Sequence, residues 1–361
     1  MKVRQIKHQI IILTGCLLFS CTQENNNTDV GKELAVLHVE VNVPDVPVGL
    51  SKMGMRSSVT TRSFSDQTLT DLHVFIFNSV GDSTGHGFVT GSSISNVSTL
   101  SGTGCTVYAI TNTVDDDMSS FGGLPATKTA MEEMVTPNLV TMDDICANEQ
   151  LVMSGSTTVD IVSGSNTLSD MIVKRLAAGN TLNITCQSGV ILTGYRIGNL
   201  PVRSWCIARS NANEGVASDA VEGDDAIDPA VSTDWLTTDT LPSSGITTGT
   251  TPPYILTFYM YENRRGSRIQ VGGTTGDESN QAQKTTYAPD RATYVDLFVN
   301  VGGADVVHRL YLGGTPYATN YNVKRNCLYT YNISIGPVDG LVVSTINVQN
   351  WETTTGGSAS I

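Results

Sequence analysis

The clearest chemical signal in this sequence is a cysteine near its start. Basic residues precede an apolar stretch at residues 10–19, which ends in LLFSC, with a small residue directly before Cys21. This pattern is typical of a secretory signal peptide, and the stretch is too short to cross a membrane as a helix. The enzymes that make bacterial lipoproteins require a small residue before the lipidated cysteine. We therefore expect residues 1–21 to be a lipoprotein signal peptide and Cys21 to carry the lipid.

Two alternatives remain open at this end of the chain. LTGC ends at Cys16, but a cut there leaves an apolar stretch shorter than usual. Secretion with a nearby cut and no lipid also fits. Five cysteines follow Cys21, and an odd number cannot form a closed disulfide framework. They lack CxxC spacing, so we expect buried thiols and no zinc site at Cys105, Cys146, Cys186, Cys206 and Cys327.

Catalytic chemistry is not indicated by the other polar residues. We expect no nucleophile elbow of the GxSxG type, no HExxH metal motif and no Gly-rich loop followed by a helix, and the histidines are scattered. Neighbouring carboxylates, as in residues 115–117 and 143–144, point to different faces of an extended chain, so we expect them to be solvated. The acidic run at 221–229 lacks the ligand spacing of a calcium loop. We expect no enzyme activity, no catalytic residue, no metal and no cofactor.

Aromatic side chains are the remaining candidates for ligand binding. They could form a platform for carbohydrate, although aromatic residues on alternating strand positions more often lie in a core. The residues concerned are Tyr254, Tyr259, Tyr261, Trp205 and Trp235. We expect them to be core residues, and a sugar site is the alternative.

The composition favours an exported all-β protein. Charged residues make up only 15% of the chain and long helix-forming runs are nearly absent. The net charge of −13 and the scattered lysines and arginines argue against a nucleic-acid partner, because binding to phosphates needs clustered cations. With 361 residues, the chain is long enough for two domains.

The elements expected from the pattern are almost all strands. ELAVLHVEVNVP, at residues 33–44, alternates cleanly and predicts a half-buried strand. Its expected inward residues are Ala35, Leu37, Val39, Val41 and Val43. One short helix is predicted at 127–135, with Thr129 and Glu132 as a capping box.

Two further segments are candidates for a role in processing and assembly. The loop after the first strand carries Arg56 and Arg62 in a Gly-, Ser- and Thr-rich context where proteases commonly cut. Near the C-terminus, residues 341–351 predict a strand with Val342, Ile346 and Val348 on one face.

The C-terminal half carries motifs that resemble a known family. YLGG followed by TNYNVKRNCLYTYNISIGP, at residues 311–337, is similar to the C-terminal signature of fimbrillins, the type V pilins of certain Gram-negative anaerobes. VKRLAAG, RIGNLP and FYMYENRRG fit the same family in order, at 173–179, 196–201 and 258–266. The resemblance covers the whole chain, with its specificity mainly in the C-terminal half.

Membership of this family implies assembly by strand exchange at the cell surface. Fimbrillins are exported as lipoproteins of the outer membrane, which corresponds here to acyl chains such as palmitate on Cys21. An arginine-specific protease then cuts them in the loop after the first strand, which corresponds to Arg62 or Arg56. A partner subunit's terminal strand fills the vacated groove. The matching exchange residues are Ala35, Leu37, Val39, Val41 and Val43 in the first strand, and Val342, Ile346 and Val348 in the terminal strand.

These observations combine into one expected architecture. The fold class is all-β, with two tandem β-sandwich domains of the transthyretin-like, Greek-key type. Residues 22–62 form a tether, the first strand and the cleavable loop. Residues 63–171 form the N-terminal sandwich, which uses the strand at 34–43 before cleavage, and 172–361 form the C-terminal sandwich.

The expected function is a structural and adhesive subunit of a surface pilus, or fimbrium. Its partners would be other pilus subunits and a receptor on a host or bacterial surface. Whether the subunit belongs to the stalk, the tip or the anchor stays open. The alternative is a monomeric, lipid-anchored protein that binds surface glycans. In the pilin interpretation the basic turn at 324–326 fastens a β-sheet: Asn326 bonds its own turn, and the basic side chains lie along apolar surface with their charged ends in water.

Overall fold

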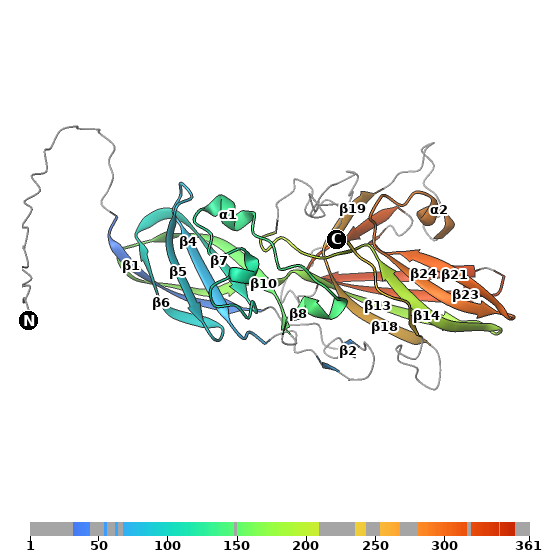
Figure 1. Ribbon diagram of the computed structural model, residues 1–361. Coiled ribbons are helices and arrows are strands. Elements are labelled where there is room, and N and C mark those ends of the chain that lie inside the picture. The colour runs from blue at the N-terminus through green and yellow to red at the C-terminus, as the bar shows by residue number, and fades with distance from the viewer. Residues whose placement is uncertain are drawn as a thin grey trace, which may run out of the picture. The chain divides into compact units, whose positions relative to one another are not determined.

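The computed structural model describes residues 32–43, 54–55, 62–63, 68–147, 150–208, 235–242, 253–267, 281–315, 319–338 and 340–350. Within these ranges the protein is all-β, as the composition predicts (Figure 1). The predictions at Cys21, Cys16 and Arg56, and the acidic run 221–229, lie outside the described residues. None of the described helices is long and apolar enough to cross a membrane.

Two sheets are built from strands in the first half of the chain. The first has the order β11-β1-β6, with β1 (Leu34–Asn42), β6 (Ser93–Leu100) and β11 (Gly164–Ile172). The second has the order β12-β10-β7-β4-β5, with β4 (Leu72–Phe77), β5 (Ser83–Val89), β7 (Gly102–Thr111), β10 (Met153–Ile161) and β12 (Lys174–Arg175). Strand β4 is buried on both faces, which explains its continuous apolar sequence.

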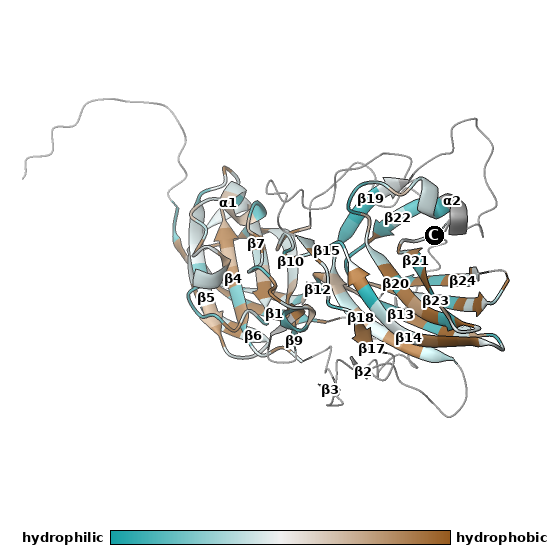
Figure 2. Ribbon diagram, turned by 45° about the vertical axis from the view of Figure 1, so that its right-hand side comes forward, coloured by the Kyte–Doolittle hydropathy of each residue, from teal (hydrophilic) through white to brown (hydrophobic). Residues whose placement is uncertain are grey.

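Two four-stranded sheets are built from the second half. One has the order β18-β13-β23-β24, with β13 (Ala177–Cys186), β18 (Tyr254–Tyr261), β23 (Cys327–Gly336) and β24 (Gly340–Asn350). The other has the order β17-β14-β20-β21, with β14 (Val190–Gly198), β17 (Leu241–Pro242), β20 (Tyr294–Val301) and β21 (Ala304–Tyr311). In Figure 2, brown hydrophobic residues lie along β13, β14 and β20.

Short strand pairs and helices complete the described fold. The pairs are β2 (Gly54–Met55) with β3 (Arg62–Ser63), β8 (Cys146–Ala147) with β9 (Gln150–Leu151), β15 (Leu200–Pro201) with β16 (Trp235–Leu236), and β19 (Asn263–Ser267) with β22 (Asn320–Val323). The helices are α1 (Lys128–Glu132), α2 (Gln281–Thr286), and the 3-10 turns η1 (Ser119–Phe121) and η2 (Met142–Ile145).

The helices depart from the prediction in two ways. Helix α2 was not expected from the sequence. The prediction of a single short helix is therefore wrong, because the described residues contain two α-helices. Helix α1 begins at a different cap: the Thr127 hydroxyl accepts a hydrogen bond from the Ala130 backbone N–H, so the predicted capping box at Thr129 and Glu132 is wrong. Thr127 has an extended backbone, as an N-cap residue requires, whereas Thr129 already lies inside the helix.

The buried apolar residues form two clusters. The first, here called the first-strand cluster, combines β1 residues with Val74, Val107, Met153 and other residues of the first two sheets. The second is larger and includes residues from both halves of the chain, among them Phe75 of β4 and Ile184 of β13. The two faces of β4 therefore contribute to different clusters.

Candidate functional site: the first strand, its groove and the terminal strand

Strand β1 occupies the middle of its sheet. It pairs with β6 in antiparallel orientation and with β11 in parallel orientation. The backbone groups on both sides of the strand are therefore engaged in pairing. Its two neighbours come from later in the sequence, so β1 is an N-terminal strand placed between two strands that do not pair with each other in this sheet.

The predicted inward face of β1 is confirmed. Ala35, Leu37, Val39 and Val41 are buried, and Val43 is half-buried against the same cluster. Removing this strand would expose apolar surface and two strand edges. Burial of Leu37, Val39 and Val41 contributes about 1.5–3 kcal/mol each, or about 5–9 kcal/mol together as an upper estimate.

Polar contacts hold both ends of β1. At its start, the Glu33 backbone N–H donates to the Ser101 hydroxyl at 3.0 Å. At its end, the Asn42 side-chain amide donates to the Asp170 carboxylate at 2.8 Å. These bonds lie at the surface and contribute little compared with the apolar face.

The predicted cleavage residue Arg62 lies in a short strand. Its partner across the β2–β3 pair is Met55, in antiparallel register. An extended backbone is the conformation in which proteases bind peptide substrates. The pair lies between the end of β1 at Asn42 and the start of β4 at Leu72, so a cut at Arg62 separates β1 from the rest of the chain.

Strand β24 pairs with β23 and has no other neighbour among the described strands. Its predicted apolar face is partly wrong. Val342 is 38% exposed, whereas its neighbours Leu341 and Val343 are 8% and 4% exposed. Ile346 and Val348, in contrast, pack against the larger cluster, as predicted.

A bulge explains the misplaced face of β24. Thr345 lies opposite Asn332 and Val343 lies opposite Ile333, so Ser344 is an extra residue in the ladder. The Ser344 hydroxyl donates to the Asn332 carbonyl oxygen at 3.0 Å. One extra residue changes the phase of a two-residue repeat, which moves Val342 to the outside.

The basic turn at 324–326 joins several segments. The Arg325 guanidinium pairs with the Glu262 carboxylate at 2.7 Å and donates to the Ser204 hydroxyl at 3.3 Å. Arg325 has a side chain that is only 12% exposed. The expectation that its charged end lies in water is therefore wrong: the carboxylate of Glu262, directly after β18, takes the place of water.

Asn326 fastens the same turn to β13 and its preceding residues. Its backbone N–H donates to the Ala177 carbonyl at 2.8 Å, and its side-chain oxygen accepts from the Arg175 N–H at 3.3 Å. Asn326 has a φ of 54°, a left-handed conformation that asparagine tolerates. The turn fastens the sheet, as predicted. The two bonds of Asn326 differ from the prediction, because they join it to Arg175 of β12 and Ala177 of β13 and not to the backbone of its own turn.

The structure also brings together two histidines that looked scattered in sequence. The His73 Nδ1 and His86 Nε2 atoms are 3.2 Å apart, and His73 Nε2 lies 2.9 Å from the Asp115 carbonyl oxygen. That oxygen only accepts, so Nε2 of His73 carries the hydrogen and Nδ1 of the neutral ring accepts from His86. Burial lowers the pKa of both histidines below the usual value.

The register of the β4–β5 hairpin creates this histidine pair. His73 lies opposite Phe88, and Phe75 lies opposite His86. The alternating aromatic and histidine residues of the two strands therefore share one face. The residues between the two strands, NSVGD at 78–82, are a signal in the sequence that could have revealed this pair, because they predict a hairpin turn that aligns the strands.

The remaining sequence candidates do not form a catalytic site among the described residues. The expectation that the sequence has no GxSxG pattern is wrong, because GDSTG at residues 81–85 matches it. Ser83, however, begins strand β5 of a hairpin rather than a strand-to-helix turn, so it is not a nucleophile elbow. Asp115, Asp116 and Asp117 lie close together, and Asp115 accepts bonds from Ser120. They are adjacent surface carboxylates of one loop.

The prediction that five aromatic residues belong to the core is right in part. Tyr259 and Tyr261 are buried, whereas Tyr254, Trp205 and Trp235 are only half-buried. Trp235 lies beneath the guanidiniums of Arg265 and Arg291. No open aromatic platform is formed by these described residues. Four cysteines are free thiols, buried or half-buried: Cys105, Cys186, Cys206 and Cys327.

Comparisons with known proteins give the fold a context. Residues 258–333 match a family described as a domain of unknown function, DUF4906. A comparison with curated protein sequences found no match. Among solved structures, the tip fimbrial protein Mfa3 from Porphyromonas gingivalis, truncated at its C-terminus, is 14% identical, with a TM-score of 0.53 over 89% of this chain and 100% of that chain.

Two further structures show the same likeness. A protein described as a cell adhesion protein from Parabacteroides distasonis is 14% identical, with a TM-score of 0.58 over 89% of this chain and 98% of that chain. The fimbrilin FimA from Porphyromonas gingivalis is 13% identical, with a TM-score of 0.51 over 90% of this chain and 99% of that chain. The chain therefore has the fold of fimbrial and cell adhesion proteins of these bacteria, as the motifs of its C-terminal half indicate.

Proposed function

We propose that this protein is a structural and adhesive subunit of a cell-surface pilus and that it polymerises by strand exchange. The fold shared with fimbrial proteins supports the proposal. The observation that carries it is the position of β1, an N-terminal strand inserted between β6 and β11. Loss of such a strand leaves a groove with an apolar floor and two unpaired edges, which a foreign strand can fill.

Maturation proceeds in two steps in this proposal. The chain is exported with lipid on Cys21 and reaches the outer membrane. An arginine-specific protease then cuts after Arg62, with Arg56 as the alternative site. Because the cut lies between β1 and β4, it releases β1 and leaves the strands of its groove in place.

The protease step is tested by replacing both arginines. In Arg56→Ala/Arg62→Ala, β1 stays in its groove, so we expect normal export and no polymer. Lys52→Ala, in the same loop, is the matched control, because it removes a cation without removing an arginine. The polymer is measured as a heat-sensitive ladder on gels of whole cells. Polymer formation at the normal rate by the double variant would refute the mechanism.

The donor in this proposal is β24 of a neighbouring subunit. Its outer edge has no partner among the described strands, and Ile346 and Val348 provide apolar side chains two residues apart. The same strand belongs to the subunit's own sheet through β23, so donation requires β24 to leave that sheet.

A deletion separates the two roles of β24. If residues 340–350 act as the donor, a chain lacking them still folds, with a lowered melting temperature because Leu341 and Val343 are lost from the larger cluster, and fails to polymerise. If they serve only the subunit's own sandwich, the truncated chain fails to fold. Circular dichroism and size-exclusion chromatography distinguish these results, and removal of residues 352–361 is the control.

A further inference from the structure

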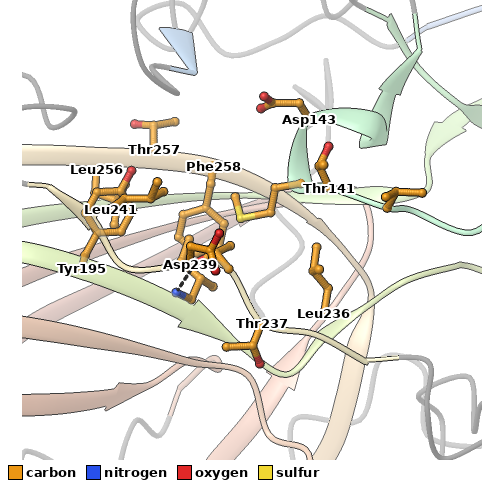
Figure 3. A pocket seen from close by; sticks show the side chains of 14 residues that line it. Thr141, Asp143, Tyr195, Leu236, Thr237, Asp239, Leu241, Leu256, Thr257 and Phe258 are labelled. Atoms are coloured by element: carbon orange, nitrogen blue, oxygen red, sulfur yellow. Dashed lines mark hydrogen bonds between the residues drawn. The ribbon is translucent and has the colours of Figure 1, made fainter.

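A hollow beside β14 and β18 has the properties of a small-molecule site. Its walls come from η2 and the turn before it, from β14, from the connection between β16 and β17, and from β18. Its volume is about 340 Å³, within the range of about 300–1,000 Å³ typical of ligand pockets. Figure 3 shows the side chains of these separate segments surrounding one space.

The floor of this hollow, here called the β14–β18 pocket, is apolar. Leu256 and Phe258 of β18 are 4% and 1% exposed, and Ile197 of β14 is fully buried. Leu241 and Met142 add further apolar surface and pack against the larger cluster. An apolar group of a ligand would be removed from water here, which favours binding in proportion to its area.

A tyrosine of β14 lines the pocket. The Tyr195 side chain is only 3% exposed, and no hydrogen bond joins its hydroxyl to any described residue. The hydroxyl is not among the fully buried unpaired polar atoms, so it is open to solvent or to a ligand in the pocket. Burial and the nearby charge of Asp143 raise the pKa of Tyr195, which keeps the hydroxyl neutral and able to donate or accept.

The charge at the pocket is entirely negative among its described residues. Asp143 comes from η2 and Asp239 from the β16–β17 connection, and both carboxylates are exposed without a described partner. The neighbouring Asp144 differs, because it accepts the Val140 and Thr141 backbone N–H groups at 2.8 and 2.6 Å. Asp144 therefore shapes the turn, whereas Asp143 and Asp239 are exposed acidic residues of the pocket lining, which contains no lysine or arginine among the described residues.

From these features we propose that the β14–β18 pocket binds a small organic cation, an apolar body bearing an ammonium group. The apolar body lies on Leu256 and Phe258, and the ammonium group lies between the carboxylates of Asp143 and Asp239. The Tyr195 hydroxyl accepts a hydrogen bond from the bound ligand. This site does not depend on polymerisation, so it stands or falls separately from the proposed function.

The test uses the full chain and three probes of nearly equal shape. Phenethylamine carries the cation, phenethyl alcohol is neutral, and phenylacetate is an anion. Calorimetric titration should give one saturable site for the amine, weaker binding of the alcohol and the weakest binding of the carboxylate. Binding of the amine should weaken with added salt, because the carboxylates are exposed and salt screens their charge.

Variants place the binding in the pocket. Asp143→Asn and Asp239→Asn should each weaken amine binding by up to about fivefold, the upper end of the range for an exposed ion pair, and leave alcohol binding unchanged. Asp116→Asn, which removes a carboxylate outside the pocket, should change neither. Thr257→Trp, at the rim, should abolish binding of both the amine and the alcohol while the melting curve of the chain stays unchanged.

The outcomes decide the proposal in either direction. Equal affinity for the amine and the alcohol, no saturable binding of the amine, or unchanged binding by both Asp→Asn variants would overturn it. A lysine-containing peptide distinguishes two sources of the same chemistry: competition with phenethylamine identifies a protein side chain as the ligand, and no competition identifies a free small amine. Either result of the competition experiment presupposes that phenethylamine binds to the pocket.

Discussion

The position of β1 predicts a large difference between two neighbouring valines. Val39 is fully buried in the first-strand cluster, whereas Val36 is half-buried on the other face of the strand. Valine to alanine removes two methyl groups, about 1.6 kcal/mol of transfer free energy, and an unfilled cavity raises the cost to about 2–3 kcal/mol at Val39. At Val36 we expect a loss of about 0.5–1 kcal/mol, because part of the side chain already contacts water.

Comparing Val39→Ala with Val36→Ala removes the effect of β-propensity, which is similar for both changes. The free energy of unfolding is measured by urea denaturation, and hydrogen exchange of the β6 and β11 amides reports on the groove itself. Val39→Ala should reduce protection of these amides more strongly. Equal losses for the two variants would show that β1 does not close an apolar groove, and the strand-exchange mechanism would lose its energetic basis.

Three further predictions concern other parts of the fold. Arg325→Ala removes the short ion pair to Glu262 and leaves that carboxylate only its longer pair with Arg264 at 3.8 Å, so it should destabilise the chain by about 1.5–3 kcal/mol, measured by urea denaturation, whereas an effect below about 0.5 kcal/mol would argue against a fastening role. The lowered pKa values of His73 and His86 predict stability that is present above about pH 6.5 and lost as the pH falls, because the unfolded chain takes up protons first; replacing both with glutamine should reduce this dependence between pH 7.5 and 5.5 and leave the part due to His308, whose pKa is also lowered by burial. Gly155→Ala forces a Cβ into the Ile172 carbonyl oxygen, so its melting temperature should fall by several degrees, and an unchanged value would contradict the close approach.

The regular parts of the fold could be predicted from sequence because burial alone decides them. In β1 every second residue is apolar, and each of those residues faces the cluster. The same rule fails in β24, because the extra Ser344 shifts the repeat and no local feature of the sequence announces it. The two-residue repeat of apolar residues therefore predicts the buried face of a strand only up to the next bulge.

Sites formed by several segments could not be predicted, for a different reason. The contact of His73 with His86 depends on the register of a hairpin, and the contact of Arg325 with Glu262 depends on strands far apart in the chain. The residues of the β14–β18 pocket come from positions between 140 and 258. Composition and residue spacing do not determine the distances between side chains of separate segments. These sites can therefore be identified only from the folded structure.

The larger hydrophobic cluster has a consequence for how the subunit responds to a mechanical load. It contains Phe77 and Tyr108 from the first half of the chain together with Leu182 and Ile335 from the second. Pulling on one half therefore strains side chains that also stabilise the other, so rupture should occur as one cooperative event at a high force rather than as two separate extensions. If the chain forms the pilus proposed above, the fibre would resist shear as a stiff rod and would not lengthen stepwise like a chain of independent modules.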